Sequence, residues 1–272
     1  MVDDPEAYGA IAAANALSDV YAMGGRPITA LSIAAIPDRD FPPEWTAAIF
    51  KGGARKLKEA GCALLGGHTV RDPEIKFGYA ITGIVEEAAL LTNGGARAGD
   101  VLVLTKPLGT GVIATAQKNG RAPEESITAS TESMSRLNRI PAELARTYKA
   151  RAATDITGFG LLGHALGLAR ESAVGLEIEA SALPLLPGAR SLAEDNQSAG
   201  LKANRRQFSQ MVDQEGEVDP TLAILAYDPQ TSGGLLLSVP EDRAPALLQE
   251  LKDARRIGRV VATTPGRIAL RA

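Results

Sequence analysis

The chain has 272 residues, of which 45% are hydrophobic and 22% charged, so its composition indicates neither a disordered nor a membrane-embedded protein. Its 29 basic and 32 acidic residues give a formal net charge of -3, which excludes the strongly basic surface typical of nucleic-acid-binding proteins. No apolar stretch reaches the roughly 20 residues that a membrane-spanning helix needs, so we expect a soluble chain.

The first hundred residues alternate helix and strand patterns. Small apolar residues at helical spacing predict a helix from Asp4 to Met23, which Gly24 and Gly25 end. The apolar run from Pro27 to Pro37 predicts a buried strand. The next patterns predict a helix and then two strands, at residues 43–60, 63–70 and 76–85. We expect an α/β domain over residues 1–97, and small polar residues at 93–100 mark its boundary.

The remainder, residues 98–272, predicts a second α/β domain. Helical patterns occupy residues 111–118, 124–147, 160–170 and 241–254. Strand patterns occupy residues 101–104, 175–179 and 234–239. The first domain has about three strand candidates, which is few beside the usual four to six, so we expect that its N-terminal part is missing.

A candidate site lies in the first helix, in the segment NALSDVYAMGG. Asn15, Ser18 and Asp19 fall at i, i+3 and i+4, which puts an amide and a carboxylate on one helix face. Asp19 either faces solvent or a neighbouring basic residue, or it is a ligand of Mg²⁺, which prefers carboxylate and phosphate oxygens. The segment alone does not decide between these readings.

A second candidate site is the glycine-bearing turn ATDITGFG at residues 153–160. Backbone N–H groups at the start of the helix that follows attract anions, and glycines let a ligand approach the main chain. Asp155 or Thr157 is alternatively an ordinary N-cap of that helix. Both alternatives remain open.

The same stretch also matches a dinucleotide-binding pattern. Gly158, Gly160 and Gly163 form G-x-G-x-x-G, and Glu177 follows about 20 residues later. An NAD-dependent dehydrogenase is therefore an alternative. The preceding KARAATDIT is not the long apolar strand that should lead into such a turn, which argues against it.

Histidine, cysteine and lysine offer weaker signals. LLGGHTV at residues 64–70 ends an apolar strand with residue types suited to phosphate or sugar oxygens, although a lone His68 is more often structural. Cys62 has small apolar neighbours and no adjacent base, which predicts a buried, inert thiol. Lys106 and the segment DPQTSGG at 228–234 occupy polar turns that we interpret as structural. A single cysteine and no apolar signal segment favour a cytoplasmic location.

Taken together, five segments resemble the selenophosphate synthetases, or selenide, water dikinases, of the AIR-synthetase-like superfamily. In chain order they are NALSDVYAMGG, LLGGHTV, LTKPLGTG, ATDITGFGLLGHA and DPQTSGGLLLSV. The resemblance covers essentially the whole chain. The first segment is shared with superfamily relatives such as thiamine-monophosphate kinase, whereas DITGFGLLGH and PQTSGG are specific to the selenium enzymes.

The resemblance implies a two-domain fold with a ferredoxin-like N-terminal half, and a homodimer in which the N-terminal sheets form a barrel. It implies ATP-dependent conversion of selenide and water to selenophosphate, AMP and phosphate, with Mg²⁺ held by aspartates. By motif, Asp19 corresponds to a metal and nucleotide ligand and Asp155 to a metal ligand. Gly67, His68 and Thr69 correspond to a nucleotide-binding turn.

The sequence departs from the family at its beginning. Family members start with a glycine-rich segment that bears a Cys or selenocysteine and, three residues on, a Lys, followed by two further aspartates; no such segment stands here. We therefore assign no catalytic residue and expect this chain to be inactive or nearly so. One expected origin of this departure is a translation start that was assigned downstream of a selenocysteine codon. A non-catalytic nucleotide-binding or dimerisation module is the alternative reading.

Overall fold

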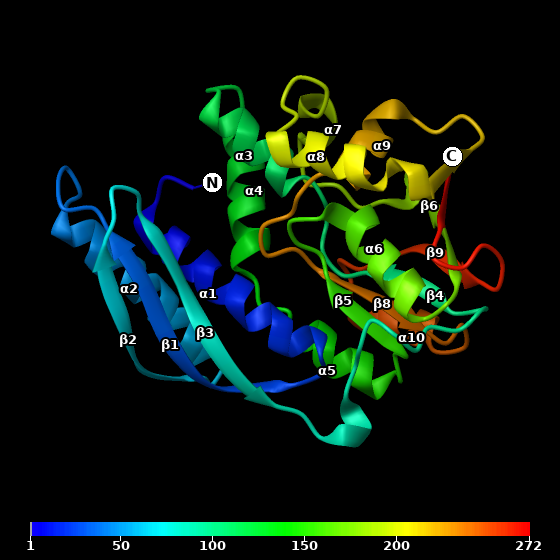
Figure 1. Ribbon diagram of the computed structural model, residues 1–272, viewed down its shortest axis with the longest axis horizontal. Coiled ribbons are helices and arrows are strands. Elements are labelled where there is room, and N and C mark those ends of the chain that lie inside the picture. Colours follow the sequence, from blue (N-terminus) through cyan, green and yellow to red (C-terminus); the bar gives the residue numbers. More distant parts are fainter. Residues whose placement is uncertain (1) are drawn as a thin grey trace.

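The structure is a computed structural model that describes residues 2–272, and it contains one β-sheet in each half of the chain (Figure 1). The first sheet has three strands in the order β2-β1-β3. Its strands are β1 (Arg26–Ile36), β2 (Ala63–Arg71) and β3 (Lys76–Ile84). β1 pairs in parallel with β2 and antiparallel with β3. A parallel pair needs a crossover connection, and helix α2 (Pro43–Glu59) supplies it.

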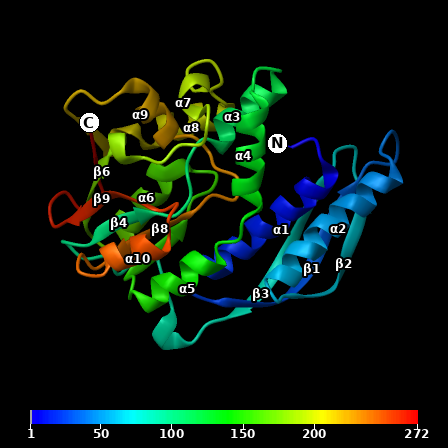
Figure 2. The same cartoon turned by 180° about the vertical axis from the view of Figure 1, so that it is seen from behind.

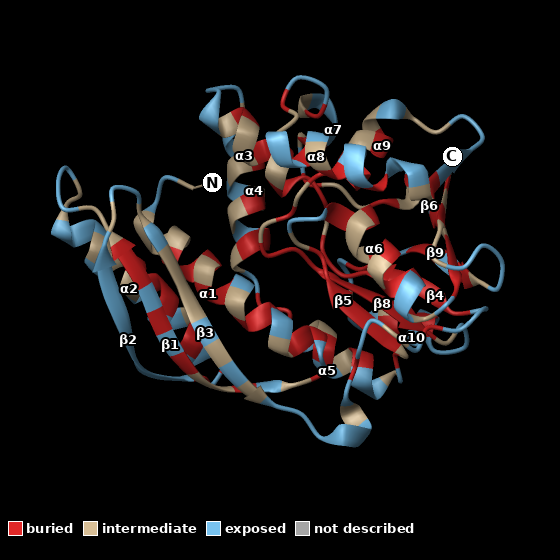
Figure 3. Cartoon of the chain, in the orientation of Figure 1, coloured by how far each residue is buried: buried red, intermediate tan, exposed pale blue. Residues whose placement is uncertain are grey.

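Only one face of the first sheet is covered. The burial of β1 alternates, so that Ala30 and Ala34 point into the core while Leu31 and Ile33 point outward. Helix α1 (Pro5–Ala22) and α2 pack on the inner face, whereas β2 is exposed along its whole length (Figure 3). The outer face of this sheet is therefore apolar and bare in the single chain.

Helices α1 and α2 touch through two glycines. A Cβ atom added at Gly9 would lie 1.8 Å from the carbonyl oxygen of Ile49, and one at Gly52 would lie 1.9 Å from that of Glu6. No side chain fits at either position, so the two backbones approach each other directly. The Asp4 carboxylate caps the start of α1 by accepting hydrogen bonds from the backbone N–H groups of Glu6 and Ala7, at 3.0 and 3.2 Å.

The second sheet has seven strands in the order β5-β8-β4-β9-β6-β10-β7. They are β4 (Val101–Leu104), β5 (Ala152–Asp155), β6 (Gly175–Glu179), β7 (Val212–Glu215), β8 (Leu235–Val239), β9 (Arg255–Val261) and β10 (Ile268–Arg271). The sheet is mixed, since β4 runs antiparallel to β8 and β9 while β10 runs parallel to β6 and β7.

Helices cover both faces of the second sheet. They are α3 (Thr110–Lys118), α4 (Glu124–Ser135), α5 (Arg139–Thr147), α6 (Gly160–Glu171), α7 (Ala189–Leu192), α8 (Ala199–Phe208), α9 (Pro220–Ala226) and α10 (Ala244–Glu250). Short 3₁₀ helices lie at Glu87–Ala89, Ala180–Ala182 and Ser209–Met211. Leu102 and Leu104 of β4 pack with α6, whereas Val101 and Val103 pack with α5 and α10 on the other face.

Helix α1 belongs to both halves of the molecule. Its buried residues, including Ala13, Leu17 and Tyr21, join one hydrophobic cluster with Ala30 of the first sheet and Val103 of the second. Figures 1 and 2 both show α1 between the first sheet and the second domain. The two halves are therefore joined by a continuous core rather than by a linker alone.

Most of the predicted elements are confirmed, with shifts of a few residues at their ends. The single helix predicted over 124–147 was wrong, because the chain breaks at 136–138 and forms α4 and α5. Strands β5, β7, β9 and β10 were not predicted. In β9, which has the sequence RRIGRVV, the buried Ile257 and Val260 lie between exposed arginines. No helix within residues 2–272 is both long and apolar enough to cross a membrane.

Candidate functional site

One face of α1 meets the loops of the second domain through hydrogen bonds. The Asn15 side-chain oxygen accepts a hydrogen bond from the backbone N–H of Ser232 at 3.2 Å. The Ser18 hydroxyl accepts one from the Asn138 amide at 3.0 Å. These two residues and Asp19 lie on the helix face that the sequence predicted, so that face is where the two domains meet.

Asn138 is a junction residue that the sequence reasoning missed. It lies between α4 and α5, is only 1% exposed, and its amide also donates a hydrogen bond to the Gly233 carbonyl at 2.9 Å. It was hidden in the helix predicted over 124–147. The signal that was available is Pro141, which fits the first turn of a new helix but not the interior of a long one.

Replacing Asn138 with Ala will lower the free energy of unfolding by about 1–3 kcal/mol, because the Ser18 hydroxyl and the Gly233 carbonyl lose their buried donor. Urea unfolding measures the change. Asn119→Ala is the matched control, since the Asn119 amide bonds only Asn196 at 3.2 Å, away from the junction. Equal stability of the two variants would show that the hydrogen bonds of Asn138 add no more to the free energy of unfolding than that of Asn119.

Asp155 is the last residue of β5 and lies where α1 contacts that strand. Its side chain is 8% exposed, and no hydrogen bond or ion pair of its carboxylate is found among residues 2–272. Although Asp19 stays exposed on one side, partial desolvation raises its pKa above the usual aspartate value, and the negative charge of Asp155 raises it further. The structure thus brings together the two aspartates that the sequence singled out, one from each domain.

Two neighbouring carboxylates repel each other unless a cation lies with them. Asp19 is open to solvent, and the described part of the chain shows no ion pair for it. The described residues also hold no group of three or more His, Cys, Asp or Glu side chains arranged to bind a metal. As two neighbouring carboxylates, Asp19 and Asp155 could hold a hard cation such as Mg²⁺, which usually takes one or two carboxylates and completes its ligands with water or phosphate oxygens.

The turn after Asp155 is held by His164. The backbone N–H of Thr157 donates to the Nε2 atom of His164 at 3.1 Å, so this nitrogen is an acceptor and the ring is neutral. Burial lowers the pKa of His164, although the charge of Asp155 opposes this. Neither Asp155 nor Thr157 caps α6; the N-cap position is Phe159, whose side chain makes no capping bond. The helix start keeps N–H groups that can meet an anion.

Lys106 ties together the two loops that contact α1. It is 1% exposed, and its amino group donates to the carbonyls of Arg136 at 2.7 Å and Ser232 at 2.8 Å. Burial lowers its pKa to about 7, and the charges of Arg136 and Lys56 act in the same direction. This supports the structural role that we interpreted from the sequence.

The glycine-rich start of α3 is closed by the protein's own side chains. The Asp228 carboxylate accepts from the N–H groups of Gly111 and Val112 at 3.1 and 3.2 Å. The side-chain amide oxygen of Gln230 accepts from those of Gly109 and Thr110 at 3.0 and 3.1 Å. Burial raises the pKa of Asp228 to about 7. The DPQTSGG segment therefore acts as an internal cap, and this helix start is not open to a ligand.

Gly67, His68 and Thr69 lie elsewhere. They belong to the interior of the edge strand β2, which agrees with the strand predicted over 63–70, and not to the turn that the family resemblance implies. His68 is paired with Ile33, so its side chain shares the bare outer face of the sheet. Figures 1 and 2 place β2 on the side of the sheet away from the second domain, so one chain does not bring these residues to Asp19 and Asp155.

The remaining signals have structural explanations. Gly160 has φ +67° and lies against the backbone of Tyr227, and a Cβ at Gly163 would lie 2.6 Å from the Phe208 ring. β5 is an edge strand antiparallel to β8, so these glycines do not open the parallel unit of a dinucleotide-binding fold. Cys62 is buried, and burial raises the pKa of its thiol.

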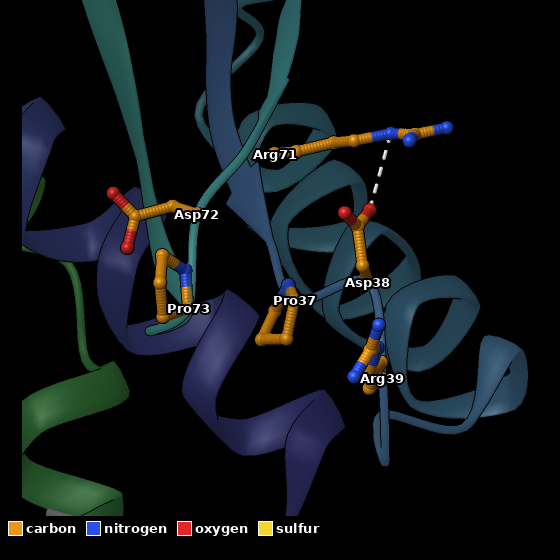
Figure 4. Close-up of a pocket in the computed structure, with 6 residues that line it drawn as sticks. All are labelled: Pro37, Asp38, Arg39, Arg71, Asp72 and Pro73. Atoms are coloured by element: carbon orange, nitrogen blue, oxygen red, sulfur yellow. Dashed lines mark ion pairs between the residues drawn. The ribbon is translucent and has the colours of Figure 1, made fainter.

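A recess of about 370 Å³ lies at the far end of the first sheet (Figure 4). Three of its four charged side chains pair locally: Arg71 Nε lies 3.1 Å from the Asp38 carboxylate, and the Asp72 carboxylate lies 2.6 Å from the Lys76 amino group. Neither Asp19 nor Asp155 lines it. Because neither aspartate of the predicted site lines this recess, we place the candidate site at the domain junction instead.

Comparison with known proteins is consistent with this arrangement. Residues 1–85 match the family described as AIR synthase related protein, N-terminal domain, and residues 97–271 match its C-terminal domain. A selenide, water dikinase of Citrifermentans bemidjiense is 47% identical over 249 residues, which are 91% of this chain and 72% of that protein. One from Clostridioides difficile is 43% identical over 270 residues, 96% of this chain and 76% of that protein.

A solved structure resembles the fold closely. AaThiL complexed with AMPPCP and TMP superposes with a TM-score of 0.72 at 25% identity, covering 98% of this chain and 77% of that one. The mixed α/β architecture expected from the sequence is thereby confirmed. The domain boundary expected at residue 97 stays a prediction.

Proposed function

Because the chain belongs to the family of selenide, water dikinases, we propose that it serves the ATP-dependent synthesis of selenophosphate from selenide and water, with release of AMP and phosphate. The observation that carries the proposal is the pair Asp19 and Asp155, two unneutralised carboxylates brought together from different domains. The dehydrogenase alternative is not favoured, because Gly160 and Gly163 serve packing and the preceding strand β5 pairs antiparallel with β8.

The residues of the junction have distinct roles in this proposal. Asp19 and Asp155 would hold Mg²⁺, which neutralises the phosphate oxygens of ATP when it is bound. The uncapped start of α6 offers backbone N–H groups to the same anion. Asn15 and Ser18 fix the position of α1 against the second domain, so Asp19 is oriented before the nucleotide arrives.

We propose a homodimer formed through the first sheet. Its outer face exposes Leu31, Ile33 and Leu65, the last at 68%, which is unusual for a surface that meets only water. His68 shares that face beside Ile33. A second copy laid over it would cover the apolar residues and bring the His68 side chain to the interface, with Gly67 and Thr69 beside it in the same strand, where they join a nucleotide site. A cytoplasmic location remains a prediction.

Calorimetry and an AMP-release assay test the function. We expect ATP to bind in the presence of Mg²⁺ and NAD not to bind; the reverse result would reject the proposal. Selenide-dependent AMP release separates an enzyme from a nucleotide-binding module, which would bind ATP without producing AMP.

A further inference from the structure

A cavity of about 220 Å³ lies between the two domains, beside the C-terminal end of α1. Tyr21 and Gly25 line it from the first domain, together with Arg26 at the start of β1. Arg139 and Arg146 line it from α5 of the second domain. At about 30 Å³ for each water, the volume corresponds to roughly seven water molecules, which leaves room for a small hydrated anion.

The charge of this cavity is strongly positive. Three arginines line it, Arg26, Arg139 and Arg146, against the single carboxylate of Glu143. Arg139 Nε lies 3.9 Å from the Glu143 carboxylate, a weak contact, and its guanidinium also donates to the Glu59 carbonyl at 3.1 Å. Across residues 2–272, neither Arg26 nor Arg146 forms an ion pair. The guanidinium groups thus keep donors available, and their fork suits planar or tetrahedral oxyanions.

Tyr21 supplies an independent sign of a missing partner. Its side chain is 2% exposed, and its hydroxyl finds no hydrogen-bond partner in the described part of the chain. Burial raises the pKa of Tyr21 to about 12, while the positive charge of Arg139 opposes this rise, so that charge acts at the hydroxyl. A buried hydroxyl without a partner costs free energy, and an acceptor in the cavity would remove that cost.

The cavity is separate from the junction of Asp19 and Asp155. Successive residues of an α-helix are rotated by about 100°, so Tyr21 lies about 200° from Asp19 around α1. Neither aspartate lines the cavity. An anion bound here would therefore contact the opposite side of the helix that carries Asp19.

We propose that this cavity is a second anion site, which binds a phosphate-sized tetrahedral oxyanion through Arg26, Arg139, Arg146 and the Tyr21 hydroxyl. Because its lining comes from both domains, a bound anion favours the domain arrangement seen here over any more open one. Free inorganic phosphate and the phosphate group of a nucleoside monophosphate both offer such a tetrahedral oxyanion.

Calorimetric titration of the full chain with inorganic phosphate at low ionic strength tests the proposal. We expect Arg146→Gln to lower the phosphate affinity about tenfold or more, since it removes a charge-assisted contact. Arg206→Gln on α8 is the matched control, an exposed arginine outside the cavity, and should leave the affinity unchanged. A wild-type chain that does not bind phosphate, or an Arg146→Gln variant of unchanged affinity, would overturn the proposal.

Two further variants separate a site from a structural effect. Tyr21→Phe should weaken phosphate binding without lowering the thermal stability of the chain, because the hydroxyl has no partner to lose. Asp19→Asn should leave phosphate binding intact; its loss would assign the anion to the nucleotide site and contradict a second one. Titration with AMP tells the sources apart, since weaker binding of AMP than of phosphate identifies free phosphate as the ligand and equal binding identifies the phosphate group of a nucleotide.

Discussion

Replacing Asp155 with Asn will lower the Mg²⁺-dependent affinity for ATP by about tenfold or more. The carboxylate is 8% exposed and is not engaged in any hydrogen bond or ion pair within the described chain, so its charge is available for a cation. An amide supplies an oxygen but no charge, and contacts to charged groups contribute about 1.5–3 kcal/mol. Calorimetry with ATP at fixed Mg²⁺ measures the change.

The same variant should have an opposite effect on the protein without Mg²⁺. The charge of Asp155 raises the pKa of Asp19, which means that the two carboxylates repel each other. Removing one charge relieves this repulsion, so Asp155→Asn should be at least as stable as the wild type in urea. A variant that is less stable and binds ATP normally would show that Asp155 is a structural residue.

Asp19→Asn completes the comparison. We expect it also to weaken ATP binding, and the double variant to lose less than the sum of the two single losses, because both residues would serve one cation. Asp195→Asn is the matched control, an exposed aspartate outside the junction. Unchanged affinity in both single variants would remove Asp19 and Asp155 from the site.

Gly52→Ala will destabilise the protein by about 2 kcal/mol or more. The new Cβ would lie 1.9 Å from the Glu6 carbonyl oxygen, closer than any real contact, so α1 and α2 must move apart. Alanine otherwise favours a helix by about 1 kcal/mol relative to glycine, so the steric cost must exceed this gain. Thermal or urea unfolding measures the difference.

Gly167→Ala provides the control, because Gly167 lies in the interior of α6 and an added Cβ there meets no atom within 4 Å. This variant should be more stable than the wild type by about 1 kcal/mol. Opposite signs for the two substitutions would show that Gly52 serves the close contact of two helices. Stabilisation by both would refute that role.

Periodicity predicted the elements whose apolar residues are continuous. The helix α1 and the strands β1 and β4 follow this rule, since most of their buried positions are Ala, Ile, Leu or Val. Strand β9 was not predicted, because Arg255, Arg256 and Arg259 occupy its exposed positions and obscure the alternation of apolar and polar residues. Its exposed side takes part in ion pairs with other strands, such as Arg259 with Glu177, and such partners are not visible in a local segment.

The site was predictable to a similar extent. The spacing of Asn15, Ser18 and Asp19 places them on one helix face whatever the rest of the chain does. Asp155 was identified from its turn, although its closeness to Asp19 depends on how the two domains pack. Asn138 is recognisable only once the break between α4 and α5 is known. The anion cavity combines residues from α1, β1 and α5, so no local pattern contains it.

The contact between Asn15 and Ser232 joins residues 217 positions apart in the sequence. Chains are synthesised at about 5–20 residues per second, so α1 leaves the ribosome between about 10 and 40 s before the loop that it must meet. Until then, the face of α1 that will pack on the second domain has only solvent or a chaperone to cover it. The helix that unites the finished protein is thus exposed to misassembly while the rest of the chain is being made.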